Sequence, residues 1–175
     1  MSVYHPTITV ITGQEALDLM VGILQRYDVG HLAINGSGEP PDDFPYVIPL
    51  NHTYHDGKLT LHGSITGKKV EMIERSPRIC YGVYGTQSSP VKDGEVLRSC
   101  SKDYQSVVCY GTVGIEHGGE EWRKSLGAFA RDYSHKPPEH KEAENTDCFV
   151  IEIHEMTARV AFHPEPKVIY RYCFS

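Results

Sequence analysis

Apolar side chains near the start of the chain recur at a spacing of three and four residues: Leu17, Met20, Val21 and Leu24. This period predicts a helix with one apolar face. The run T-G-Q-E at 12–15 comes just before it and matches a capping box, in which Thr12 caps the helix start. We therefore predict a helix that begins just after Thr12 and ends before Gly30.

Six other stretches have the β-branched, aromatic or alternating residues that are typical of strands: 31–35, 46–53, 59–62, 78–84, 105–116 and 149–162. Asp56 and Gly57 stand between the second and third stretches and predict a tight hairpin turn. Pro49 lies inside the second stretch and predicts either a sheet edge or a bulge there. In the fifth stretch, Gly111 and Gly114 permit a bend or a bulge.

Two more helices fit the pattern. One covers about 67–75 and is ended by Pro77. The other is marked by a stripe of apolar side chains: Trp122, Leu126, Phe129 and Tyr133. Because strands do not alternate regularly with helices, a doubly wound parallel sheet is disfavoured. A small antiparallel barrel with helices packed outside it fits better.

The composition narrows the classes of protein that suit this pattern. The chain has 175 residues, 39% of them apolar, which predicts one domain over 1–175, with its core at about 14–162 and a tail at 163–175. Lys and Arg number 17 against 23 Asp and Glu, so the net charge of −6 argues against a nucleic-acid partner. No apolar run approaches the roughly 18 residues that span a bilayer, so no membrane partner is expected. Five cysteines without a C-x-x-C pair favour reduced thiols in a cytoplasmic protein.

The segment 61–69, LHGSITGKK, holds the most informative chemistry. A strand ends there, a Gly/Ser/Thr turn follows, and a helix starts with Lys68 and Lys69 in its first turn. These lysines oppose the helix dipole, whereas a bound anion would reverse the sign of that interaction. The hydroxyls of Ser64 and Thr66 would add donors to a phosphate. The spacing does not match a P-loop, and the alternative to a phosphate site is a solvated helix start with two surface lysines.

Other chemistry-bearing residues have weaker patterns. Backbone groups freed at Pro49 suit the N–H and C=O edges of a flat heterocycle, although an ordinary edge strand explains the same proline. Three histidines, His52, His55 and His62, share one hairpin, but no zinc spacing occurs and no metal site is predicted. Cys100 lies in a polar loop, yet no recognisable base accompanies it, so thiol catalysis is not expected.

Three stretches, taken in order, carry a family resemblance: GHLAINGSGEP, then FPYVIPLNHTYHDGKLTLHGSITGKKVEMIERSPRICYGVYG, then YQSVVCYGTVGIE. With the helix that follows, they resemble the flavin-binding split barrels related to pyridoxamine 5′-phosphate oxidase, and among these the nitroimidazole-resistance-type proteins. The similarity runs from Leu17 to Phe162, and the hairpin followed by H-G-S-x-x-G-K-K is its most specific part. It implies a mainly β fold: a six-stranded antiparallel split β-barrel with about three outer helices.

The resemblance also implies where a cofactor binds. Such proteins form homodimers with FMN, or sometimes FAD, at each subunit interface. The first hairpin strand would lie along the isoalloxazine ring: Val47, Ile48, Pro49, Leu50 and Asn51. The ribityl chain and phosphate would meet the end of the next strand and the helix start: His62, Gly63, Ser64, Gly67, Lys68 and Lys69. The start of the long strand would approach the ring edge: Tyr104, Ser106 and Val107.

The implied activity is a flavin-dependent reduction of a small molecule, such as a nitro-aromatic, with electrons from NAD(P)H. The catalytic residues are unknown, although His62 and Tyr104 are candidate proton donors near the ring. The flavin strand lacks the basic residues of the vitamin-pathway oxidase, and no second phosphate cluster appears, so oxidation of pyridoxamine phosphate is not expected. The tail PEPKVIYRYCFS would either be mobile or cover the neighbouring subunit's site. The alternatives are a flavin-binding module without catalysis and a haem-binding split barrel.

Overall fold

The computed structural model describes residues 9–36, 38, 44–86, 104–133, 145–161 and 168–174. Within these residues the chain forms eight strands and three helices. In chain order they are β1 (Thr9–Thr12), α1 (Gln14–Arg26), β2 (Val29–Ile34), β3 (Tyr46–His55), β4 (Lys58–Ser64), α2 (Lys68–Arg75), β5 (Arg78–Gly85), β6 (Tyr104–Glu116), α3 (Gly119–Tyr133), β7 (Thr146–Ala161) and β8 (Val168–Cys173). No helix in the described part of the chain is long and apolar enough to cross a membrane.

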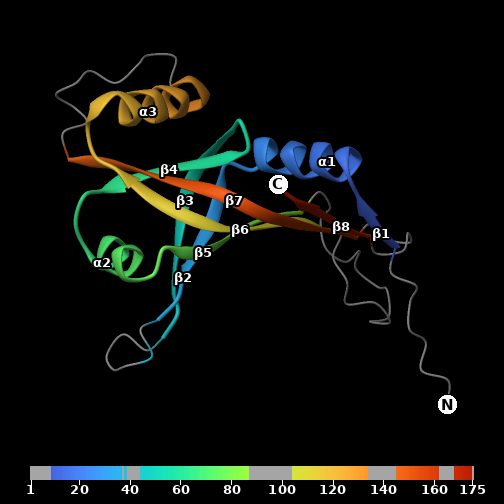
Figure 1. Cartoon of the computed structure of the whole chain (residues 1–175). Coiled ribbons are helices and arrows are strands. Elements are labelled where there is room, and N and C mark those ends of the chain that lie inside the picture. The colour runs from blue at the N-terminus through green and yellow to red at the C-terminus, as the bar shows by residue number, and fades with distance from the viewer. Residues whose placement is uncertain are drawn as a thin grey trace, which may run out of the picture.

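Six of the strands close a barrel. In order around it they are β7, β4, β3, β2, β5 and β6, and β6 pairs back onto β7 (Figure 1). Every neighbouring pair in this ring is antiparallel. The predicted six-stranded antiparallel barrel with three outer helices is therefore confirmed.

The turn between β3 and β4 takes the predicted tight form. Both of its central residues have positive φ, 49° at Asp56 and 77° at Gly57. This is the backbone that a two-residue hairpin turn needs, and Asp-Gly tolerates it well. The register that follows pairs His55 with Lys58 and His52 with Leu61.

The long strand β7 joins the barrel to two further strands. Its first half pairs with β4 and its second half with β8, while β6 runs along its other edge. The register shifts where Tyr110 pairs with Glu155 but Gly111 pairs with Ile153, so His154 has no partner on β6. A bulge near the β6 glycines was predicted, and this shift confirms it.

Strands β1 and β8 extend the sheet beyond the barrel, and neither follows from the sequence pattern. Residues 168–173 of the tail form β8, which pairs antiparallel with β7, and β1 adds to its other edge in parallel. The side chains of Tyr170, Tyr172 and Phe174 pack against the core. The described part of the tail is therefore a sheet strand and not a mobile segment.

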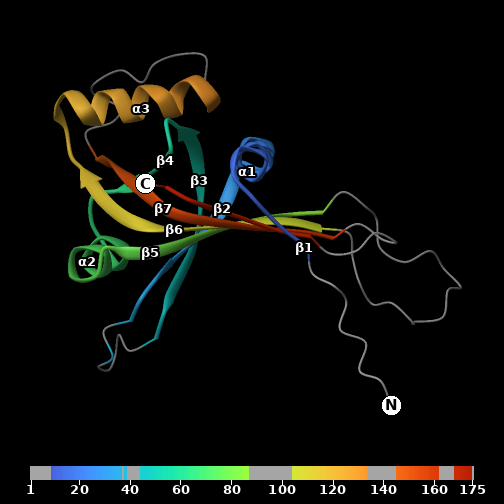
Figure 2. The same cartoon turned by 45° about the vertical axis from the view of Figure 1, so that its right-hand side comes forward.

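The helices lie outside the barrel. Figure 2 shows α3 and α1 on one side of it and α2 on the other. Helix α1 buries Met20 and Leu24 of the predicted apolar face, together with Ile23, while Leu17 and Val21 are half-buried. Its cap differs from the prediction, because Gly13, with φ 78°, occupies the N-cap position in place of Thr12 and no side chain caps the helix. Helix α3 is fixed by Trp122, whose Nε1 donates to the Thr146 carbonyl at 2.9 Å.

Candidate functional site

The end of β4 and the start of α2 place Lys69 inside the protein. The Lys69 side chain is 7% exposed, and its Nζ lies 3.8 Å from the centroid of the Phe149 ring. Gly63 makes this position available, because a Cβ there would come within 2.3 Å of the Lys69 Nζ. The ammonium therefore lies directly against the backbone of β4.

The charge on Lys69 is poorly compensated by the described residues around it. No hydrogen-bond acceptor for its Nζ is found among them, and the ammonium lies over the ring of Phe149. Burial lowers the pKa of the Lys69 ammonium from its ordinary value of 10.5, and the Asp147 carboxylate opposes this shift. Asp147 is 3% exposed and already accepts a hydrogen bond from His117 Nδ1 at 2.6 Å. A buried cation in such surroundings is costly unless an anion completes them.

Lys68, the other lysine of the predicted pair, lies in a different environment. It is exposed, and its Nζ is 5.6 Å from the centroid of the Tyr46 ring on β3. The sequence pattern predicts the same role for both lysines, whereas in the structure only Lys69 is buried. The contact with Tyr46 shows that the helix start lies beside the first residues of β3.

The turn before α2 offers further hydrogen-bond donors. Gly67 is the N-cap residue with φ 107°, and no side chain caps the helix. The Gly67 carbonyl accepts from the backbone N–H groups of Val70 and Glu71, at 2.9 and 3.2 Å, and the positive end of the helix dipole at this turn favours an anion. The backbone N–H of Thr66 donates to the Ser64 Oγ at 3.3 Å, which folds the turn toward the end of β4.

His62 lies at the edge of this region. Its ring packs edge-on against Phe129 of α3, with 4.3 Å between ring centroids. Burial lowers the pKa of the His62 imidazole from its ordinary value of 6.5, and the positive charge of Lys69 lowers it further. The imidazole is therefore neutral at neutral pH, with one nitrogen able to donate and the other able to accept.

Among the described residues, the first half of the predicted flavin strand is paired along one edge only. Residues 46–51 of β3 pair with β2, and the pairing of β3 with β4 begins only at His52. Pro49, opposite His31, lies in this half-paired stretch, so its prediction as an edge residue is confirmed. The side chains of Val47, Pro49 and Asn51 are exposed, while those of Ile48 and Leu50 are half-buried against the core.

The residues predicted to meet the ring edge lie elsewhere in the same chain. Along β7, Tyr104 pairs with Ala161, whereas Ser64 pairs with Thr146, fifteen positions away (161 − 146). Within one chain, β6 therefore does not bring Tyr104 or Ser106 to the Lys69 region. The Val107 side chain is fully buried, and its backbone lies between Val83 of β5 and Ala158 of β7.

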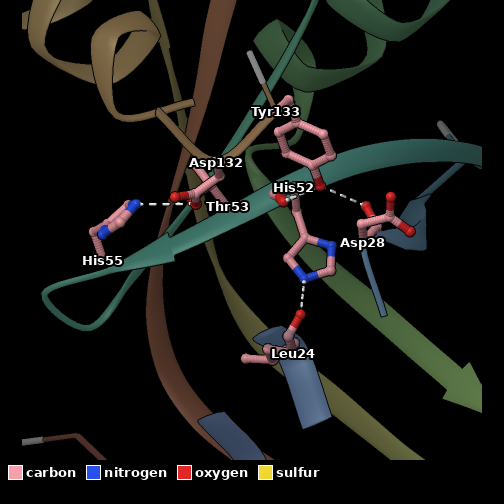
Figure 3. A network of polar contacts seen from close by, with 7 residues as sticks. All are labelled: Leu24, Asp28, His52, Thr53, His55, Asp132 and Tyr133. Atoms are coloured by element: carbon pink, nitrogen blue, oxygen red, sulfur yellow. Dashed lines mark hydrogen bonds and ion pairs between the residues drawn. The ribbon is translucent and has the colours of Figure 1, made fainter. Parts of the chain in front are cut away.

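A polar network that the sequence did not predict lies between α1, β3 and α3 (Figure 3). It borders a cavity of about 490 Å³ lined by Leu24, Gln25, Asp28, His52, Thr53, Tyr54, His55, Asp132 and Tyr133. At its α3 end, Thr53 Oγ1 donates to the Asp132 carboxylate, and His55 Nε2 lies 3.2 Å from the same oxygen. The hydroxyl of Tyr133 donates to the His52 carbonyl at 2.6 Å. No short motif in the sequence connects these residues, because they lie about 80 positions apart.

Among the described residues, no group of three or more His, Cys, Asp or Glu side chains is placed to hold a metal ion. Burial raises the pKa of the Cys80 and Cys109 thiols, which suits small core residues. Cys100, the thiol considered from the sequence, lies outside the described residues.

Comparison with known proteins identifies relatives by family and by fold. The family model described as pyridoxamine 5′-phosphate oxidase matches residues 18–160. A search of curated proteins finds no match. A solved structure from Bacteroides thetaiotaomicron, named for 5-nitroimidazole antibiotic resistance, is 23% identical with a TM-score of 0.66 and covers 81% of each chain.

Two other solved structures share the fold at lower identity. A FAD-binding protein from Mesorhizobium loti is 22% identical, with a TM-score of 0.58 over 82% of this chain and 94% of that one. A FAD and haem binding protein from Mycobacterium smegmatis is 18% identical, with a TM-score of 0.65 over 88% of this chain and 73% of that one. At these identities the likenesses establish the fold.

Proposed function

The chain belongs to the pyridoxamine 5′-phosphate oxidase family, and from this premise we propose that it binds FMN, with FAD as the alternative, and acts as an oxidoreductase on a small molecule. The names of two structural neighbours, a FAD-binding protein and a FAD and haem binding protein, support a flavin. The name of a third, with its 5-nitroimidazole resistance, supports a nitro-aromatic substrate.

The buried ammonium of Lys69 is the observation that carries the proposal. Its described surroundings lack an acceptor, Gly63 leaves room beside it, and the start of α2, with its backbone N–H groups, lies at the same turn without a side-chain cap. A phosphate would supply the missing negative charge and accept these donors. The residues present therefore fit the phosphate end of FMN, with Lys68 adding a second, exposed charge.

The unpaired edge of β3 fits the flat ring of the same cofactor. Backbone groups on this edge have no ladder partner from β4 before His52, and the exposed Val47 and Pro49 side chains add apolar surface beside them. A ring with N–H and C=O groups along one side could pair with that backbone, as it would with a neighbouring strand. The Lys68 contact with Tyr46 supports a site in which this edge lies beside the proposed phosphate region.

We propose a homodimer as the functional unit. Tyr104 and Ser106 on β6 pair with the last residues of β7, whereas the end of β4 beside Lys69 pairs with the first residues of β7. They would therefore reach a flavin held by β3 and α2 only from a second subunit. The exposed apolar side chains of Val47 and Tyr84, 56% exposed each, are available to an interface. The sedimentation behaviour of the purified chain tests this assembly.

When bound, the flavin would supply the redox chemistry, taking two electrons from NAD(P)H and passing them to the oxidised substrate. The residues of this chain would hold it and adjust the surroundings. Lys69 would neutralise the phosphate, and the backbone of β3 would orient the ring. A neutral His62 beside Lys69 would accept a proton at its unprotonated ring nitrogen or donate one from the other. The half of β3 that would meet the ring has no basic side chain, which favours a substrate without a negative charge at that position.

The absorption spectrum of the purified protein, with mass identification of the released cofactor, tests the proposal. A flavin spectrum, or its recovery after addition of FMN or FAD, is expected. A colourless protein that neither flavin restores would overturn it, and a Soret band would assign the chain to haem binding instead. Turnover with NADH or NADPH and a nitro-aromatic then separates an enzyme from a flavin-binding module without catalysis.

A further inference from the structure

Strand β3 changes its neighbour at one point, immediately after the stretch proposed to meet the flavin ring. Residues 46–51 pair with β2, and residues from His52 onward pair with β4. At this junction the backbone N–H of His52 donates to the Asp28 carbonyl at 3.1 Å. The orientation of the last flavin-side residues, Leu50 and Asn51, therefore depends on how the junction is held.

The Tyr81 hydroxyl holds the junction from inside the barrel. Tyr81, on β5, is fully buried, and its hydroxyl donates to the Leu50 carbonyl at 2.7 Å. Gly30, which pairs with Leu50 across β2 and β3, makes room for the phenol, because a Cβ at Gly30 would lie 2.5–2.6 Å from the ring and its hydroxyl. The close approach of ring and backbone requires a glycine at this position.

His52 shares that hydroxyl. Its Nδ1 lies 2.9 Å from the Tyr81 hydroxyl, and its Nε2 lies 3.0 Å from the Leu24 carbonyl (Figure 3 shows the second contact). A carbonyl only accepts, so Nε2 must carry a proton. In a neutral ring Nδ1 is then an acceptor, and it competes with the Leu50 carbonyl for the single hydroxyl proton of Tyr81.

Burial decides which form of His52 is present. The side chain is 3% exposed, and burial lowers the pKa of the imidazole, which favours the neutral ring at neutral pH. The hydrogen bond to the Leu24 carbonyl and the Asp28 carboxylate oppose this shift and favour the cation. Tyr133, from α3, and Cys109, from β6, are the other titratable groups that face the Tyr81 hydroxyl.

We propose that Tyr81 and His52 are positioning residues for the flavin-facing stretch of β3: the Tyr81 hydroxyl fixes the Leu50 carbonyl, and His52 in its Nε2–H tautomer shares the proton that does so. The inference rests on the proposed function, because it assigns the pair a role toward the ring of the same cofactor. It separates two parts of that site. Lys69 acts on the phosphate, and the Tyr81–His52 pair acts on the strand beneath the ring.

Riboflavin and FMN together test the assignment, because riboflavin has the ring without the phosphate. We expect Tyr81→Phe and His52→Gln each to weaken the binding of both flavins by the same factor, about five- to tenfold for one lost hydrogen bond. Tyr54→Phe is the matched control for the first, since it also removes a hydroxyl that bonds the backbone, at Gly57. His55→Gln, on the same strand but outside the pair, is the control for the second, and both controls should stay within about twofold.

Nitrogen-15 NMR of the imidazoles supplies a readout that a purely structural role would not change. In the wild-type protein His52 should carry its proton on Nε2, and flavin binding should shift the Nδ1 signal; in Tyr81→Phe that shift should vanish. Circular dichroism of each variant shows whether it folds. If Tyr81→Phe does not fold, the binding data of His52→Gln test the positioning role.

The outcomes separate the two proposals. If the wild type binds both flavins and the two variants bind them equally well, the positioning role is overturned but the proposed function is not. A His52 protonated only on Nδ1 also overturns it. A wild-type protein that binds neither flavin overturns the proposed function and the positioning role with it.

Discussion

Two buried polar groups of this chain differ in how they are satisfied. Both ring nitrogens of His52 have partners inside the fold, at 2.9 and 3.0 Å, and the network around it ties α1, β3 and β5 together. Lys69 is buried to a similar degree, yet no described acceptor reaches its Nζ, and burial lowers its pKa. A buried group with partners inside the fold stabilises it, whereas a buried ammonium without such a partner offers an anionic ligand a place to bind.

The largest expected effect comes from removing the incompletely satisfied charge. Lys69→Met should weaken FMN binding by about 10- to 100-fold, because a charge-assisted hydrogen bond contributes about 1.5–3 kcal/mol. The same change should leave the melting temperature of the flavin-free protein equal or higher, because a buried cation has been replaced by an apolar side chain of similar length. Titration calorimetry and thermal unfolding measure the two effects. Lower stability of the flavin-free variant would show that Lys69 is satisfied within the fold.

Around His52 and its partner Tyr81, in contrast, a substitution should lower the stability of the flavin-free protein. Gly30→Ala should destabilise the protein by about 1–3 kcal/mol, because its Cβ would displace the Tyr81 ring from a packed core. Gly22→Ala is the matched control, since nothing lies within 4 Å of its Cβ and alanine favours a helix by about 1 kcal/mol. Urea unfolding of both variants measures the difference. Equal stability of the two would mean that Tyr81 tolerates displacement.

Much of the barrel could be predicted from the sequence because its signals are local. The apolar period of α1, the Asp-Gly turn and the glycines beside the β7 bulge act over a few residues. Strands β1 and β8 were not predicted, because their pairing with each other joins the two ends of the chain. The two lysines at the start of α2 were predicted to meet an anion. That only Lys69 is buried depends on the space left by the missing side chain of Gly63 and on the ring of Phe149, which lies far away in the sequence. Likewise, His52 and Tyr81 lie 29 positions apart, and no local pattern connects them.

A smaller effect is expected where the network meets α3. Asp132→Ala removes the acceptor of Thr53 and the partner of His55, so we expect a loss of about 1 kcal/mol in the free energy of unfolding. Glu121→Gln is the control, because it breaks an exposed pair with Lys124 and should leave the stability nearly unchanged. Guanidinium unfolding compares the two. A loss no larger than that of the control would mean that Asp132 does not hold α3 to β3.

The smallest expected effect is the pH dependence of the protein's stability. The pKa of His52 is below 6.5 in the fold, so the unfolded chain binds the proton first as the pH falls. Stability should therefore be complete above pH 6.5 and decline below it. His62, whose pKa is lowered in the same direction, adds to the decline. Melting temperatures between pH 8 and pH 5 should fall less steeply in His52→Gln than in the wild type, and parallel profiles would contradict the assignment.

The most direct test of the account compares FMN with riboflavin on the wild type and on Lys69→Met, because only FMN carries the phosphate that Lys69 is proposed to hold. Binding is followed by quenching of flavin fluorescence at constant ionic strength. The account predicts that the wild type prefers FMN by about tenfold or more and that the preference disappears in Lys69→Met. A wild type that binds both flavins equally, or a preference that survives the substitution, would contradict it.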